Sequence, residues 1–204
     1  HDRLYTRVAE RFDRLNQLLH PIFGRAPFVW DDPAIGTFGL AGVHHLVRTD
    51  LEAPVDSGAL MRTLLAKVQA EGVLLRPRCP VVALEESPTE VVLRLADDAP
   101  IRAANVVVCT NGYTRALLPD VAVDPARGQV LRTAPIPGLR LRGTFHYDEG
   151  FYYFRDHDGG VLLGGGRHLD VAGETTTDDA TTAPIQQALE QLLRDTRWHD
   201  LDYL

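Results

Sequence analysis

Residues 143–166 read GTFHYDEGFYYFRDHDGGVLLGGG, and this stretch decides the fold. Segments of mixed polarity at 143–147, 151–155 and 161–165 alternate with short turns rich in Asp and Gly. A similar segment precedes them at 129–134, and no helix is predicted between any of these segments. Strand-like segments joined by short turns are typical of an antiparallel sheet, which we expect here.

The residues before this sheet have a different texture. Residues 105–109 read NVVVC, which is continuously apolar and predicts a parallel strand buried on both faces. The turn Thr110-Asn111-Gly112 follows at the carboxyl end, where open α/β sheets bind their ligands. Further strands are predicted at 73–75 and 80–84, and a hairpin is predicted from 90–95 and 101–103.

Amphipathic helices are predicted at 2–19, from Asp56 or Ser57 to Gly72, and around 185–193. We expect Pro21 and Gly24 to end the first helix, and short strands to follow it at 28–30 and 43–49. A polar loop at 173–179 precedes the last helix.

The composition bounds the classes of function. The 204 residues are 45% hydrophobic and 24% charged, with a net charge of -7. An acidic surface disfavours binding to nucleic acid and to anionic lipid. The sequence contains no run of about 18 apolar residues, so no membrane span is predicted. The two cysteines predict reduced, buried thiols and a cytoplasmic location. No metal site is expected, because the adjacent His44 and His45 would point to opposite faces of a strand.

Four segments in order carry a resemblance to a known family: Thr110–Thr114, Pro125–Val130, Phe145–Phe154 and Gly164–His168. Together they resemble the D-amino-acid oxidase family of FAD-dependent oxidoreductases. The resemblance implies an α/β (α+β) fold in which part of a three-layer FAD-binding domain is joined to an antiparallel substrate domain. It divides the chain into a helix and strands that pack on the substrate domain (1–56), a partial FAD-binding domain (57–124), an antiparallel substrate-domain sheet (125–170) and a final loop, helix and truncated strand (171–204).

The resemblance also implies where the cofactor lies. The backbone of Val81 or Val82 is expected against the adenine of FAD, and the turn formed by Cys109, Thr110, Asn111 and Gly112 close to the dinucleotide. Small residues suit that turn, because its backbone must approach the ligand closely. Arg127 and Gly128 are expected near the isoalloxazine ring, where the guanidinium would favour the reduced form electrostatically.

A substrate pocket is implied on the antiparallel sheet. Tyr152 matches the position where amine-oxidising members place a tyrosine, and alternation along a strand puts Phe154 on the same face. His146, and with it Tyr147, are candidates to line the cavity, and Arg167 stands at the end of a strand. The implied reaction passes the α-hydrogen of a small amine or amino acid to FAD as a hydride. No catalytic acid or base is assigned.

Two features of the family are missing from the sequence. There is no Gly-x-Gly-x-x-Gly motif after a first strand, and nothing resembling the family's carboxylate-holding segment. We therefore expect an internal fragment that binds FAD weakly and is inactive alone, with residues 105–109 and the aromatic strands sharing one crevice. Two alternatives stay open: a flavin-free ligand- or partner-binding module, and an oxidoreductase for an aminomethyl group on a modified tRNA base, which the acidic charge disfavours. The oligomeric state and the electron acceptor are left undecided.

Overall fold

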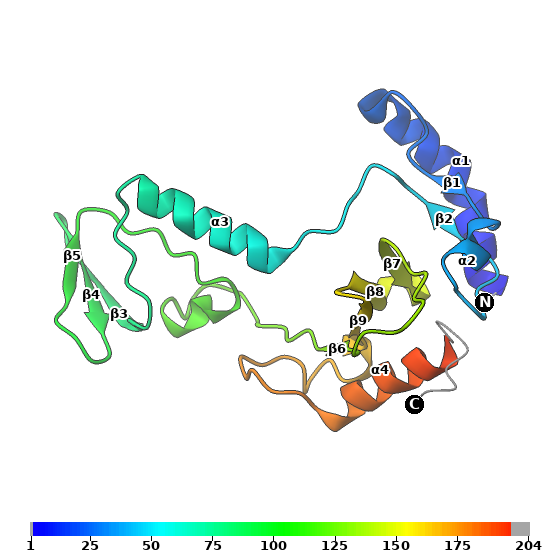
Figure 1. Ribbon diagram of the computed structural model, residues 1–204. Helices are drawn as coiled ribbons and strands as arrows, with labels where there is room; N and C mark the ends of the chain where they lie inside the picture. Colours follow the sequence, from blue (N-terminus) through cyan, green and yellow to red (C-terminus); the bar gives the residue numbers. More distant parts are fainter. Residues whose placement is uncertain (1, 197–204) are drawn as a thin grey trace. The chain divides into compact units, whose positions relative to one another are not determined.

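The computed structural model describes residues 2–196, and its chain forms two compact units (Figure 1). The four-stranded unit comprises His1–Pro54, Gly128–Val171 and Ala180–Leu204. The three-stranded unit comprises Val55–Arg127 and Ala172–Asp179. The four-part division of the chain stays a prediction. In the described part of the chain, no helix is both long and apolar enough to cross a lipid bilayer.

The antiparallel sheet predicted from residues 129–165 is confirmed. Its strands are β6 (Val130–Arg132), β7 (Thr144–Tyr147), β8 (Tyr152–His157) and β9 (Gly160–Gly165), in the order β6-β9-β8-β7. Every neighbouring pair is antiparallel. Asp158 and Gly159 join β8 to β9 with φ angles of 47° and 78°. Two consecutive residues in the left-handed region fit a two-residue hairpin whose twist matches that of the strands.

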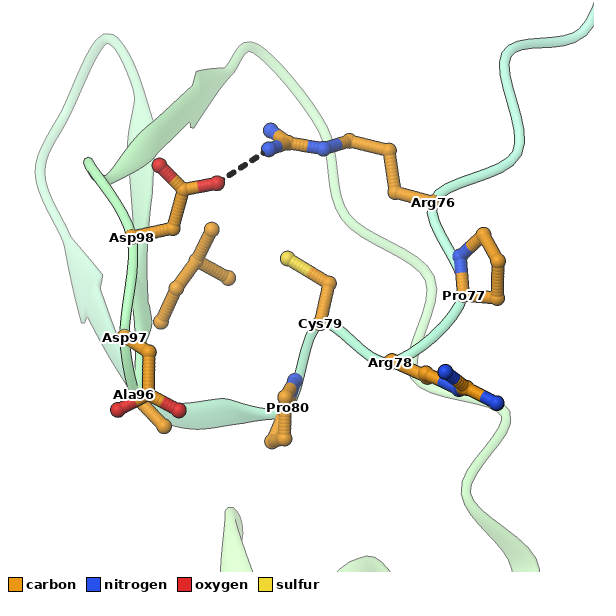
Figure 2. Close-up of a pocket in the computed structure, with 9 residues that line it drawn as sticks. Arg76, Pro77, Arg78, Cys79, Pro80, Ala96, Asp97 and Asp98 are labelled. Carbon is orange, nitrogen blue, oxygen red and sulfur yellow. Dashed lines mark hydrogen bonds and ion pairs between the residues drawn. The ribbon is translucent and has the colours of Figure 1, made fainter.

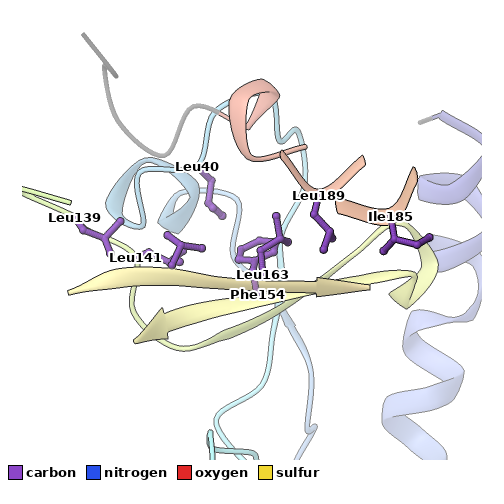
Figure 3. Packing of buried hydrophobic residues seen from close by; sticks show 8 residues of the cluster. Leu40, Leu139, Leu141, Phe154, Leu163, Ile185 and Leu189 are labelled. Atoms are coloured by element: carbon purple, nitrogen blue, oxygen red, sulfur yellow. The ribbon is translucent and has the colours of Figure 1, made fainter. Parts of the chain in front are cut away.

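One face of this sheet carries the hydrophobic core (Figure 3). The helix α4 (Ala183–Asp195) lies over it, contributing Ile185 and Leu189. The other buried members are Leu40, Leu139, Leu141, Phe154, Val161 and Leu163. The rings of Phe145 and Phe154 stack at 5.1 Å. The predicted last helix is therefore confirmed, and its apolar positions are the ones that bury.

The first helix, α1, runs over Asp2–Phe23 and passes through Pro21. The prediction that Pro21 ends it is wrong, because a proline this close to the end of a helix disturbs few backbone hydrogen bonds. Gly24 makes the stop: its φ is +70° and its N–H donates to the carbonyl of His20 at 2.8 Å. A short helix, α2, covers Ala34–Thr37.

Two short strands, β1 (Val29–Trp30) and β2 (Val47–Arg48), pair antiparallel and are shorter than predicted. The side-chain amide of Asn16 ties α1 to them, with both its oxygen and nitrogen bonded to the Phe28 backbone at 3.0 Å. Asp32 follows β1 and accepts from the Leu46 N–H at 2.8 Å and lies 2.9 Å from His45 Nδ1. The hydrogen bond from Leu46, then that of His45, lowers the pKa of Asp32 below its usual 3.8.

In the three-stranded unit, α3 (Ser57–Ala70) begins at Asp56, whose Oδ1 accepts from the Ala59 N–H at 2.8 Å. This confirms the predicted cap, and Gly72 follows the helix at a φ of +81°. The strands β3 (Val81–Glu86), β4 (Val91–Leu95) and β5 (Ile101–Ala103) form an antiparallel sheet in chain order. The predicted strand after Pro80 and the predicted hairpin are thus confirmed.

Two predicted strands are wrong. Residues 73–75 and 105–109 are not strands, and Val107 is 84% exposed. A continuous apolar run indicates burial on both faces, but a strand also needs neighbours to complete its hydrogen bonds, and none of the described strands pairs with these residues. The extended pattern predicted at 202–204 lies outside the described residues. Because 105–109 and the aromatic strands belong to different units, their shared crevice stays a prediction.

Candidate functional site

A cluster of aromatic rings lies at one end of the four-stranded sheet. It comprises Tyr147 of β7, Phe151 before β8, Tyr152 of β8 and His168 of the 3₁₀ helix η3 (Arg167–Leu169). The rings of Phe151 and His168 are 4.1 Å apart, and those of Tyr152 and His168 are 5.5 Å apart and nearly perpendicular. The rings of Tyr147 and Tyr152 are 6.5 Å apart. We call these four residues the aromatic cluster.

Tight turns bring the cluster together. Between β7 and β8, the short 3₁₀ segment η2 (Asp148–Gly150) has positive φ at all three residues, which sets Tyr147 opposite Tyr152 in the ladder. Gly165, the last residue of β9, adopts a φ of +120°. A Cβ there would come within 2.1 Å of the Phe151 carbonyl oxygen, so only glycine fits. This close crossing carries the chain into η3.

The hydroxyl of Tyr152 and the imidazole of His168 are polar groups of the cluster. Burial, then the charge of Asp148 and the neighbouring Tyr147, raises the pKa of Tyr152 above its usual 10.0. The phenol therefore stays protonated at neutral pH and can donate a hydrogen bond. Nδ1 of His168 is buried and has no hydrogen-bond partner in the described part of the chain. A buried polar atom without a partner is uncommon and marks a place where a ligand group could bind.

The residues predicted for the substrate are divided among several places. Tyr152 belongs to the aromatic cluster, and Arg167 precedes His168 in η3. Phe154 is buried in the core, where its stacking on Phe145 accounts for its position. His146 lies on the opposite, open face of the sheet, paired with Tyr153. The structure therefore brings Tyr152 and Arg167 to one end of the sheet, and it places His146 and Phe154 elsewhere.

The open face of the sheet holds a feature that sequence reasoning missed. The ring of Tyr153 covers Gly164 of β9, where a Cβ would come within 2.5 Å of the ring. The hydroxyl of Tyr153 also reaches the space next to Gly128. The sequence signal is the glycine run 164–166, but the run alone does not identify the ring that lies against it.

The residues predicted to hold FAD lie in the three-stranded unit, with the exception of Gly128. The β3–β4 ladder pairs Val81 with Leu95 and Ala83 with Arg94, so Val82 forms a bulge and is exposed. Bulges often lie beside binding sites, because they redirect the strand locally. The exposed bulge suits a ligand that approaches the main chain.

The turn after residue 109 is also open. Cys109 and Asn111 are exposed, and Asn111 begins the 3₁₀ helix η1 (Asn111–Ala116) with a φ of +45°. The hydroxyl of Thr110 lies 3.1 Å from that of Thr114. A Cβ on Gly112 would approach Pro125 to 3.3 Å, so internal packing alone favours a glycine there. The main chain of this turn is accessible, but these contacts do not form a cradle for a diphosphate.

Arg127 forms a buried ion pair with Glu174. Its Nε and Nη2 donate to the two carboxylate oxygens at 3.0 and 2.7 Å, and the side chains are 12% and 1% exposed. The Arg127 N–H also donates to the Glu174 carbonyl at 2.8 Å. A guanidinium already neutralised in this way does not fit the role predicted for it beside a flavin ring. Glu174 was missed, since a glutamate in a polar loop gives no local signal of burial.

Gln129, two residues later, makes a second buried contact. Its Oε1 accepts from the Thr182 N–H at 2.9 Å and from Gln186 Nε2 at 3.0 Å, and its Nε2 donates to Thr182 Oγ1 at 2.8 Å. These bonds hold the start of α4 against β6. The segment Arg127-Gly128-Gln129 is therefore anchored by side chains on both sides of its glycine.

A pocket of about 250 Å³ opens in the three-stranded unit, between the loop before β3 and the β4–β5 turn (Figure 2). Its lining includes Arg76, which pairs with Asp98, and the thiol of Cys79. None of the residues predicted for cofactor or substrate lines it. Within residues 2–196, no group of three or more His, Cys, Asp or Glu side chains could hold a metal ion.

Two comparisons with known proteins bear on the family of this chain. No curated protein matches the sequence. A family model described as FAD dependent oxidoreductase (DAO) matches residues 4–201, which covers nearly the whole chain and both of its units. The mixed helices and antiparallel sheets agree with the α/β fold expected for that family. The chain belongs to the FAD-dependent oxidoreductase family of the DAO type.

Proposed function

We propose that this chain is part of an enzyme that oxidises a small amine or amino acid, and that the aromatic cluster binds the substrate. FAD, when bound, supplies the oxidising chemistry by accepting a hydride from the carbon that bears the amine. The observation that carries the proposal is the contact of the Tyr152 and His168 rings at 5.5 Å, with Nδ1 of His168 buried and without a hydrogen-bond partner among the described residues. Both are polar groups set among aromatic rings, as small-molecule sites require.

The cluster suits an amino acid in particular. The rings of Tyr147 and Phe151 offer apolar surface to the substrate carbon atoms, and the Tyr152 hydroxyl can donate to a carboxylate oxygen. Arg167, next to His168 in η3, adds positive charge at the same end of the sheet. A carboxylate held by a phenol and a cation is fixed in orientation, which aligns the reacting carbon.

Binding of amino acids to the purified chain tests this proposal. Tyr152→Phe removes the hydroxyl and keeps the ring. A hydrogen bond to a charged group contributes about 1.5–3 kcal/mol, so we expect affinity for a small amino acid to fall at least about tenfold. Tyr153→Phe is the matched control, because it makes the same chemical change one residue away on the open face. Calorimetric titrations with glycine, alanine and sarcosine, with and without FAD, provide the measurement.

Equal affinities for the two variants would contradict the assignment of the cluster. A second candidate function, a flavin-free binding module, is favoured by the engagement of Arg127 with Glu174. It predicts amino-acid binding that FAD leaves unchanged at every FAD concentration. The oxidoreductase proposal instead predicts that amino acid and a large excess of FAD, which its weak binding requires, each stabilise the protein against thermal unfolding, and that together they stabilise it more.

A further inference from the structure

The helix α1 carries an apolar stripe of five residues, four of which are exposed. We call it the α1 seam, and its members are Leu4, Val8, Leu15, Leu18 and Ile22. They are spaced by four and three residues in alternation, with Arg11 taking the one missing place. This is the heptad repeat of helices that pack along their length.

A second apolar stripe on the same helix packs within the unit. Tyr5 stacks on His45 at 4.0 Å and Phe12 on Trp30 at 4.9 Å. The α1 seam is the neighbouring stripe, and its exposure rises to 63% at Leu18 and 72% at Ile22. Internal packing therefore accounts for the stripe that contains Tyr5 and Phe12, whereas the α1 seam remains largely exposed.

The spacing indicates what kind of surface fits the seam. In heptad terms Val8, Leu15 and Ile22 are the a positions, and Leu4 and Leu18 are d positions. Two of the three a residues, Val8 and Ile22, are β-branched, and β-branched residues at a with leucine at d favour packing against one other helix. A flat sheet face or a loop would not follow this 3.5-residue period over the length of α1.

The charges beside the seam indicate the chemistry of that helix. Arg11 interrupts the seam and Arg14 borders it, and the structure shows no ion pair for either among the residues it describes. Arg7, on the same border, pairs with Glu149 at 3.3 Å. We propose that the α1 seam docks an amphipathic helix of a partner polypeptide whose apolar stripe is flanked by carboxylates.

Two other occupants fit less well. In a parallel pair with a second copy of this chain, Arg11 would face Arg11, and in an antiparallel pair the borders with Arg7 and Arg14 would face each other. A bilayer favours a broad apolar face, and here Arg11 lies within a stripe that is bounded by the stacked rings. Both remain outcomes of the test.

Fluorescence anisotropy with designed peptides provides the test. The probe is a labelled three-heptad peptide with Ile at a, Leu at d and Glu at both flanking positions, and its counterpart has Lys at those positions. We expect the Glu peptide to bind the full 204-residue chain saturably, more weakly at high salt, and the Lys peptide to bind at least tenfold less tightly. Arg11→Glu should reverse this preference.

Matched variants separate the seam from the rest of the helix. Leu18→Asp should weaken binding of the Glu peptide at least tenfold, and Gln17→Asp, which adds the same charge on the other side of α1, should leave it unchanged. Circular dichroism checks that both variants fold. The proposal is overturned if neither peptide binds, if both bind alike, or if Leu18→Asp instead abolishes self-association in sedimentation or binding to phosphatidylserine vesicles.

Discussion

Replacing Glu174 with Gln should destabilise the loop at 172–179 strongly. The substitution keeps the shape of the side chain and removes the charge that neutralises Arg127. Removing one partner of a buried ion pair costs about 3–5 kcal/mol, because the other charge stays buried. Arg127 would keep its contacts with the carbonyls of Gly173 and Asp178, both at 3.3 Å. We therefore expect a value near the lower limit, about 3 kcal/mol.

Hydrogen exchange at one amide measures this effect directly. The Arg127 N–H donates to the Glu174 carbonyl, so it exchanges when the loop opens. A loss of about 3 kcal/mol corresponds to an exchange rate about a hundredfold faster. Glu190→Gln is the control, because Glu190 pairs with Arg194 on the exposed side of α4. Exposed pairs of this kind contribute about 0.5 kcal/mol or less.

The double variant Arg127→Met with Glu174→Leu sharpens the result. If the cost of Glu174→Gln comes from an uncompensated charge, removing both charges should restore most of the lost protection. Exchange at Arg127 that is no faster in Glu174→Gln than in Glu190→Gln would refute the reasoning. It would mean that solvent reaches the guanidinium and that the pair is not buried in solution.

The remaining predictions concern the four-stranded unit. Gly165→Ala should lower the free energy of unfolding by about 3 kcal/mol or more, because the new Cβ clashes with the Phe151 backbone. Gly164→Ala should lower it by about 1 kcal/mol, because its Cβ meets the movable end of the Tyr153 ring. Thermal unfolding compares the two variants, and equal losses would contradict these two contacts. Leu189→Ala should cost about 2–5 kcal/mol in urea unfolding, and a smaller loss would mean that α4 does not cover the core. The pKa of Asp32 is depressed on folding, so its stabilising effect is present above pH 3.8 and is lost as the pH falls further. Asp32→Asn should flatten that acid dependence in a series of melts, and an unchanged slope would show that another group causes it.

Local patterns were sufficient for much of the fold. The cap at Asp56 and the stops at Gly24 and Gly72 each depend on a few adjacent residues, and all are found as predicted. The alternation that separates Tyr152 from Tyr153 is likewise a property of any strand. These features follow from backbone geometry and need no distant partner.

Features that depend on distant partners were missed. The run at 105–109 predicted burial, but its apolar character could not supply the strands that a sheet requires. The ion-pair partner of Arg127 is Glu174, which lies 47 residues away, and no local pattern identifies it. The crowding at Gly164 comes from the ring of Tyr153, whose place depends on the register of two strands.

The side-chain amide of Gln129 has a consequence for how this protein folds. Thr182, at the start of α4, makes no capping bond with its own side chain, and its N–H donates to Gln129, which lies 53 residues earlier, just before β6. An isolated thirteen-residue helix is marginal in water. The helix and the edge of the sheet should therefore form in a single cooperative event, with their amides becoming protected from exchange at the same rate during refolding.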